Sequence, residues 1–148
     1  AIFDVAVPGK EILGILERAR PGSALLIQKP MGESLSDAEQ ILALCRAKRL
    51  TAAINFQLRF APNVLALRDA LARGFFGELL DLDVRICLHT PWELWPFLAG
   101  LPRMEIALHS IHYLDLMRAL LDKPVLKRIS VFFDGTWNRP ESSCMSLT

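Results

Sequence analysis

Apolar residues along the first 60 positions follow two alternating patterns. Short, nearly continuous apolar runs are typical of buried strands, and segments with an apolar residue every three to four positions are typical of helices. Strand-type runs occupy residues 1–7, 23–30 and 51–60, and helix-type segments occupy 10–20 and 37–49. The order strand, helix, strand, helix, strand predicts a parallel sheet connected by right-handed crossovers.

The second half of the chain has a different pattern. Pro62 fits the first turn of a helix that ends near Gly74. Residues 79–90 alternate apolar and polar positions, as a strand with one exposed face does. Residues 104–121 are apolar on most faces, which predicts a buried helix, and 125–135 have the pattern of one more strand.

The change of pattern near residue 60 predicts two domains in an α/β fold. A length of 148 residues suits one average domain or two incomplete ones. We expect a parallel-sheet domain in 1–60, followed in 61–148 by the start of an α/β domain with an open mixed or antiparallel sheet. The sequence opens without Met, on an apolar run typical of a strand in the middle of a sheet, so we expect a fragment of a longer protein.

Charge and cysteine content narrow the classes of partner. Lys and Arg number 17 against 16 Asp and Glu, a net charge of +1, so no long-range field favours nucleic acid or anionic lipid. Cys45, Cys87 and Cys144 are odd in number and far apart, which argues against disulfides and fits a reducing compartment. No apolar run has the pattern of a membrane span or a signal peptide. We expect a soluble cytoplasmic protein with no nucleic-acid or membrane partner.

The segment MEIALHSIHYLD, residues 104–115, concentrates ionisable side chains. In an α-helix, Glu105, His109 and His112 fall within about 60° of one another and would share one stripe. Asp115, one turn after His112, would be able to fix the tautomer of the imidazole and raise its basicity. This arrangement is typical of a general base that works near neutral pH.

Other interpretations of these histidines stay open. A single histidine is more often a hydrogen-bonded core or surface residue than a catalytic one. The H-x-x-H spacing with nearby carboxylates would also suit zinc or iron. We assign no metal site, because His89 is the only other histidine and the sequence offers no obvious distant ligand. A serine nucleophile is not indicated, since the G-x-S-x-G pattern is absent from the sequence.

Lys29, in the sequence QKPM, is the second candidate for chemistry. It follows an apolar strand, and open α/β sheets bind ligands outside the carboxyl ends of their strands. A lysine also occurs at strand ends simply because its long side chain reaches water. Pro30 and Gly32 directly after it predict a special backbone path, with a candidate cis peptide bond before Pro30. We therefore favour a functional role for Lys29.

These residues resemble the Gfo/Idh/MocA oxidoreductases, the family that includes glucose–fructose oxidoreductase and inositol dehydrogenases. The resemblance covers nearly the whole chain and is carried by four motifs in the family's order. They are E-K-P, N-x-x-x-R-F-x-P, G-x-x-G-E and I-H-x-x-D, represented here by Gln28-Lys29-Pro30; Asn55, Arg59, Phe60 and Pro62; Gly74, Gly77 and Glu78; and Ile111, His112 and Asp115.

The resemblance implies a two-domain enzyme. The first domain would be the C-terminal part of a Rossmann domain that holds NAD or NADP, and the second would begin a domain for substrate and oligomer contacts. By likeness to the family, Lys29 would orient and polarise the substrate near the nicotinamide, and His112 would exchange a proton with its hydroxyl. Pro30 and Arg59 would join Lys29 beside the cofactor. Burial beside a cationic nicotinamide would lower the pKa of Lys29.

The sequence departs from the family pattern at three points. Gln28 replaces the usual Glu of E-K-P, which removes a carboxylate and keeps a hydrogen-bonding shape. Leu108 stands four residues before His112, where the family often has an acid, and Glu105 or His109 is a candidate substitute. No G-x-G-x-x-G occurs in these 148 residues, so we expect this piece alone to bind a dinucleotide weakly or not at all.

Together these patterns predict an NAD(P)-dependent oxidoreductase for a sugar, polyol or related hydroxyl or carbonyl compound. The helix stripe would form the acid/base wall of a substrate cleft that faces Lys29. Trp92 and Trp95 either pack a hinge or stack on a sugar ring. The alternatives are a non-catalytic binding or regulatory relative of the same fold and, third, a metal-dependent hydrolase. Exposed sheet edges predict association, most simply as a homo-oligomer.

Overall fold

The computed structural model describes residues 2–78, 81–98, 101, 104–121, 131–133 and 142–147. The chain divides into two compact units, Ala1–Phe56 and Gln57–Thr148. Residues 57–60, which the sequence pattern joined to the strand before them, group with the second unit. They form a 3-10 turn, Gln57–Phe60, that packs against helices of that unit.

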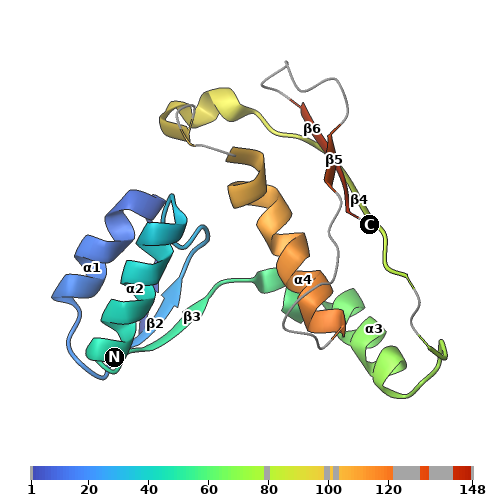
Figure 1. The fold of residues 1–148 in the computed structure, drawn as a ribbon, viewed down its shortest axis with the longest axis horizontal. Helices are drawn as coiled ribbons and strands as arrows, with labels where there is room; N and C mark the ends of the chain where they lie inside the picture. The colour runs from blue at the N-terminus through green and yellow to red at the C-terminus, as the bar shows by residue number, and fades with distance from the viewer. Residues whose placement is uncertain are drawn as a thin grey trace. The chain divides into compact units, whose positions relative to one another are not determined.

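The first unit is a parallel sheet with two helices. Its strands are β1 (Ile2–Val5), β2 (Ala24–Ile27) and β3 (Thr51–Ile54), and its helices are α1 (Ile12–Arg18) and α2 (Leu35–Ala47). The strands lie in the order β1-β2-β3, and all pairs are parallel. Figure 1 shows α1 and α2 next to each other beside these strands. The predicted parallel sheet is confirmed.

The register explains which face of this sheet the helices cover. Val5, Ile27 and Ile54 are aligned across the three strands and point to the same face. That face packs against both helices in one apolar core, whose buried members are Val5, Ile12, Leu16, Leu25, Ile27, Ile41 and Cys45. On the opposite face, Asp4 and Leu26 are aligned and exposed.

The loop after β2 has a tightly constrained path. The peptide bond between Lys29 and Pro30 is cis, as the sequence predicted. Gly32 has a φ of +86°, a conformation that only glycine adopts readily. Helix α2 then begins with a capping box, in which Ser34 accepts from the backbone N–H of Asp37 and Asp37 accepts from the backbone of Ser34.

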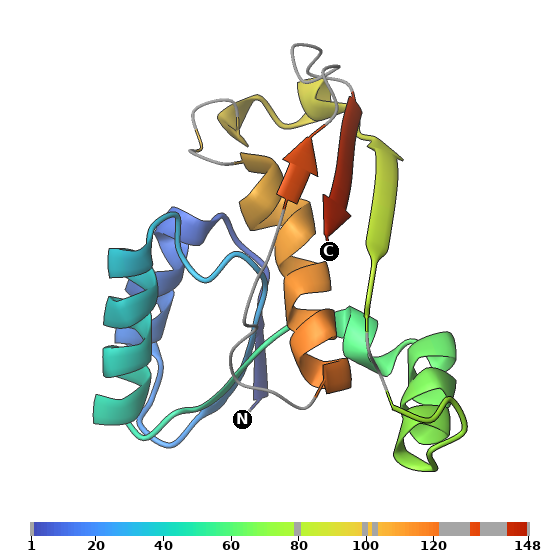
Figure 2. The same ribbon diagram turned by 45° about the vertical axis from the view of Figure 1, so that its right-hand side comes forward.

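The second unit combines helices with an antiparallel sheet. Its helices are α3 (Pro62–Ala72) and α4 (Ile111–Leu121), with a π-helical turn, Ile106–Ser110, directly before α4. Two 3-10 turns, Trp92–Leu94 and Pro96–Leu98, lie between α3 and α4 in the sequence. The strands are β4 (Val84–His89), β5 (Val131–Phe133) and β6 (Ser142–Leu147), in the order β4-β6-β5. Figure 2 shows these strands together with α4.

The predicted strands of the second unit are partly confirmed. β4 begins at Val84 rather than at residue 79. Of the predicted strand 125–135, only 131–133 lie within the described residues, and they form β5. β6 has no counterpart among the predicted elements, because its sequence SSCMSL has few apolar residues at strand spacing. Both pairs are antiparallel, which confirms the predicted type of sheet.

Gly32 allows a direct test of the loop that follows β2. A Cβ at position 32 would lie 2.4 Å from the Cβ of Asp37, whereas one at Gly22, whose φ is also positive, would meet nothing within 4 Å. Gly32→Ala should lower the free energy of unfolding by about 2–4 kcal/mol, and Gly22→Ala by about 1–2 kcal/mol, because only the first displaces the capping residue. Urea unfolding measures both, and equal losses would contradict this account of the loop.

Candidate functional site

A row of polar side chains crosses the carboxyl ends of the three parallel strands. Asn55, directly after β3, donates from Nδ2 to Oε1 of Gln28 at 3.2 Å. Gln28, directly after β2, donates from Nε2 to Oδ1 of Asp4, in β1, at 3.4 Å. These two bonds fix which end of the Gln28 amide faces each neighbour. Position 28 therefore presents a neutral, oriented hydrogen-bonding group where the family motif has a carboxylate.

Lys29 follows this row and precedes the cis bond to Pro30. The residue is half-buried, and this burial lowers the pKa of its amine below the ordinary value. A lower pKa makes the neutral amine, which can accept a proton, more accessible near neutral pH. A glutamate at position 28 would have favoured the charged amine, so Gln28 is consistent with the same tendency.

The segment before α4 departs from the regular α-helix that the sequence pattern predicted. The turn Ile106–Ser110 is π-helical, so its backbone bonds span five residues instead of four. Ser110 Oγ accordingly donates to Oε2 of Glu105, five positions earlier. Glu105 and His109 nevertheless face each other, and the extension of the predicted stripe to His112 stays a prediction.

Glu105 instead belongs to a small buried cluster of its own. Its side chain and that of Ser110 are almost fully buried. The Nδ1 atom of His109 lies 3.7 Å from Oε1 of Glu105, so the imidazole and the hydroxyl face the two oxygens of one carboxylate. A buried carboxylate is tolerated in proteins when such partners satisfy it. The cluster holds the π-helical turn together and supplies an acid close to the start of α4.

Asp115 forms a two-pronged ion pair within the second unit. Its Oδ2 accepts from Nε of Arg59 at 2.5 Å, and its Oδ1 accepts from Nη2 of the same guanidinium. Arg59 belongs to the 3-10 turn Gln57–Phe60, so the pair joins that turn to α4. The hydrogen bond with Asp115 raises the pKa of Arg59, and burial opposes this effect. His112 lies one turn before Asp115 and is also buried.

The remaining predicted positions have less defined surroundings. Leu108 is buried, so an apolar side chain occupies the place of the family's acid. Trp95 is 40% exposed, and the side chain of Trp92 lies outside the described residues. Among the side chains that the structure describes, no group of three or more His, Cys, Asp or Glu residues gathers as metal ligands. Within the same part of the chain, no helix has the length and apolar character needed to cross a bilayer.

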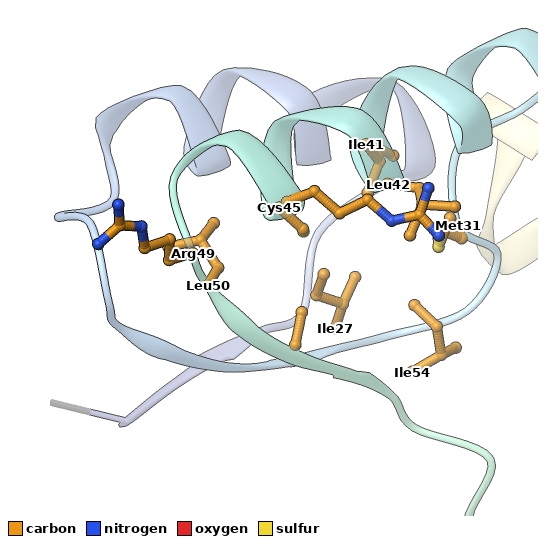
Figure 3. Close-up of a pocket in the computed structure, with 10 residues that line it drawn as sticks. Ile27, Met31, Ile41, Leu42, Cys45, Arg49, Leu50 and Ile54 are labelled. Carbon is orange, nitrogen blue, oxygen red and sulfur yellow. The ribbon is translucent and has the colours of Figure 1, made fainter.

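An apolar hollow of about 320 Å³ lies between α2 and the strands β2 and β3. Figure 3 shows Ile41, Leu42 and Cys45 of α2 on one side, with Ile27 and Ile54 on the other. Burial raises the pKa of the Cys45 thiol, which disfavours the reactive thiolate. The hollow contains none of the residues that the sequence singled out for chemistry.

The structure brings some predicted residues together and leaves one relation as a prediction. Lys29 and Pro30 lie at the carboxyl edge of the first unit, and Glu105 and His109 lie in the cluster before α4. The predicted convergence of Lys29 with His112 joins two units and stays a prediction. Sequence reasoning missed the partners Asp4, Ser110 and, as a hydrogen-bond donor to Gln28, Asn55. The alternation of side chains along a strand was the available signal for Asp4 and Asn55. Asp4 directly precedes Val5, whereas Gln28 and Asn55 directly follow Ile27 and Ile54, so all three lie on the face opposite to these aligned apolar residues.

Known enzymes match this chain in sequence. It is 26% identical over 122 residues to 1,5-anhydro-D-fructose reductase of Ensifer adhaerens, covering 78% of this chain and 36% of that protein. It is also 26% identical over 121 residues to D-apiose dehydrogenase of Paraburkholderia graminis, covering 79% of this chain and 32% of the relative. The chain thus spans about a third of the length of these curated relatives. No protein-family model matches it.

Solved structures match the fold. A dehydrogenase from Chromobacterium violaceum superposes with a TM-score of 0.74 at 20% identity, over 99% of this chain and 43% of that one. The WlbA dehydrogenase from Bordetella pertussis, solved with NADH and UDP-GlcNAcA, gives a TM-score of 0.62 at 16% identity, over 88% and 38%. These neighbours are Rossmann-type dehydrogenases, which confirms the predicted fold class.

The buried cluster before α4 generates a prediction about stability. Glu105→Ala leaves the hydroxyl of Ser110, which is 1% exposed, without this acceptor, and such a loss costs about 1–3 kcal/mol. Glu105→Gln keeps an acceptor oxygen and should cost less. In urea unfolding, the effects of Glu105→Ala and Ser110→Ala should combine less than additively, because they remove the same bond. Full additivity would show that the two side chains do not interact.

Proposed function

The chain is a relative of the Gfo/Idh/MocA oxidoreductases, and from this kinship we propose that the whole protein is an NAD(P)-dependent oxidoreductase. Its substrate would be a sugar, a polyol or a related hydroxyl or carbonyl compound. Lys29 would orient and polarise the reacting oxygen, and His112 would exchange a proton with it. Because this chain spans only part of its curated relatives, the proposal concerns the protein to which it belongs.

The observation that carries the proposal is the setting of Lys29. It is a half-buried amine with a lowered pKa, at the carboxyl edge of a parallel sheet and directly after Gln28, which is hydrogen-bonded to the neighbouring strand ends. Surface lysines lack such a combination, and perturbed amines are typical of functional sites. The carboxyl edge of an open parallel sheet is also where α/β proteins bind ligands.

The residues at this edge fit a nicotinamide cofactor. The half-buried amine of Lys29 is a hydrogen-bond donor or acceptor that matches a substrate oxygen held beside a nicotinamide, and Pro30 supplies an apolar wall next to it. When bound, the nicotinamide supplies the hydride chemistry. A solved neighbour of this fold contains NADH, which supports a nicotinamide cofactor and leaves the choice between NAD and NADP open.

The proton chemistry falls to His112 in this proposal. As a hydroxyl becomes a carbonyl, its oxygen loses a proton, which the imidazole accepts; in the reverse direction the imidazolium returns it. An imidazole that is shielded from bulk water, as that of His112 is, is suited to this exchange, because water competes less for the proton. Lys29 would stabilise the negative charge that develops on the same oxygen.

The substrate class rests on the curated relatives. The names of two of them identify a sugar or anhydrosugar as the compound that they reduce or oxidise. We propose a compound of that kind here, with Trp95, whose side chain is 40% exposed, as a candidate surface for a sugar ring.

A non-catalytic relative of the same fold is the second candidate function. Two positions favour it: Gln28 supplies no carboxylate, and Leu108 is buried where the family often has an acid. A protein of this kind would bind NADH or NADPH and a sugar without turnover. Cofactor binding followed by tryptophan fluorescence, together with an absorbance assay on a panel of sugars and polyols, separates the two functions.

His112→Ala in the full-length protein should lower kcat by about 10²–10⁴-fold with little change in NADH affinity, if His112 is the acid/base. His109→Ala is the matched comparison, since it removes an imidazole from the neighbouring turn and leaves His112 in place. Steady-state kinetics and NADH titration of both variants provide the measurement. An unchanged kcat in His112→Ala would remove this residue from the mechanism, and a larger loss in His109→Ala would transfer the role to His109.

A further inference from the structure

We propose that Arg59 and Asp115 form a clamp that positions His112 and balances the charge beside it. The clamp rests on the proposed role of His112 as acid/base and adds two positioning residues to it. Arg59 thereby has a role within the second unit, in addition to the cofactor contact that the family resemblance implies.

The geometry of the ion pair between Arg59 and Asp115 restricts the rotation of α4 about its own axis. Two parallel hydrogen bonds join the planar guanidinium of Arg59 to the planar carboxylate of Asp115, which sets the relative orientation of both groups. Asp115 is only 8% exposed and Arg59 is 39% exposed, so the bonds are shielded on the carboxylate side. A single hydrogen bond would allow Asp115 to pivot, whereas this fork does not.

Helix α4 needs a contact that restricts its rotation, because an irregular turn precedes it. α4 starts directly after a π-helical turn, whose backbone geometry is rarely sustained in proteins. On another side, Met117 of α4 packs against Ile86 of β4. An apolar contact of this kind is not directional, and it allows small rotations about the helix axis. Arg59 therefore supplies the directional contact that sets where His112, one turn before Asp115, points.

The ion pair also affects the charge next to His112, because Asp115 and His112 are both buried. A buried carboxylate next to an imidazole favours the protonated imidazole, whereas a guanidinium bonded to that carboxylate offsets the effect. The other charged or titratable groups along this helical segment are Glu105 and His109 before α4, and Arg118, which is exposed and lies one turn after Asp115; on the packed strand β4, Arg85 is exposed and donates to Asp83. None of these groups replaces the two bonds of Arg59, so the charge balance next to His112 depends on the pair.

Two substitutions at the clamp should therefore move the pKa of His112 in opposite directions. Arg59→Gln leaves the carboxylate of Asp115 without its counter-ion and should raise the pKa of His112. Asp115→Asn removes the negative charge and leaves the guanidinium, so it should lower that pKa. Arg59→Lys keeps the charge and loses the fork, so it should leave the pKa nearly unchanged and still misplace the imidazole.

The experiment measures the His112 ring resonance against pH by NMR in the full-length protein, assigned with His112→Asn, together with kcat and KM. We expect opposite pKa displacements in Arg59→Gln and Asp115→Asn. In all three clamp variants, kcat should fall by about 10- to 100-fold, with KM changing much less. The matched control is Arg73→Gln, which removes the exposed ion pair of Arg73 and Asp69 on α3, and should leave kcat and the His112 pKa unchanged.

The outcomes separate this inference from the proposed function. An unchanged His112 pKa and kcat in folded Arg59→Gln and Asp115→Asn, with activity still dependent on His112, would overturn the clamp alone. Clamp variants that lose thermal stability, but keep the pKa of His112 and the kcat per folded molecule, would show that the pair of Arg59 and Asp115 is only a structural contact. That result would overturn the clamp as well. Opposite pKa displacements in a protein without oxidoreductase activity would support the clamp and overturn the proposed function. If Arg59→Gln fails to fold, Asp115→Asn and Arg59→Lys still decide the question, because neither leaves a buried charge unpaired.

Discussion

The alignment of three parallel strands determines where the chemistry of the first unit can be. Because β1, β2 and β3 end in register, whatever follows β2 and β3 in sequence must meet at one edge of the sheet. Gln28 and Asn55 are neighbours for this reason, and Lys29 is held next to them although it lies 26 positions before Asn55. The apolar core under α1 and α2 keeps the strands in that register. A one-residue slip would send each of these polar side chains to the opposite face.

The second unit positions its candidate residues by other means. A parallel sheet supplies a ready-made edge, whereas a single helix depends on its ends and its contacts to set the direction of each side chain. Here the buried carboxylate of Glu105 organises the π-helical turn, and the pair of Arg59 and Asp115 anchors α4 one turn later. Together, the two carboxylates bracket His112. One of them sets where the helix starts and the other sets its rotation, so neither needs to contact the substrate to affect the reaction.

Local sequence patterns predicted most of the described helices and strands, because strand and helix spacing and the positions of proline and glycine are local properties. The cis bond before Pro30 and the parallel sheet belong to this group. The end of the strand at Ile54 was not predictable, since residues 57–60 alternate polar and apolar side chains as a strand does. They depart from the strand because they pack against α3 and α4. The π-helical turn was also missed, because one inserted residue in a helix changes the backbone bonds without changing the composition. The pairing of Arg59 with Asp115 joins positions 56 residues apart, and only the tertiary structure shows it.

The central claim is that Lys29 and His112 act on the same substrate oxygen. A double-mutant cycle in kcat/KM tests it most directly, with Lys29→Met, His112→Ala and the double variant of the full-length protein assayed on the best sugar or polyol of a panel. Residues that act as a unit lose their effects together, so the double variant should be about as slow as the slower single variant. Effects that multiply in full, or a single variant with unchanged kcat/KM, would contradict the account.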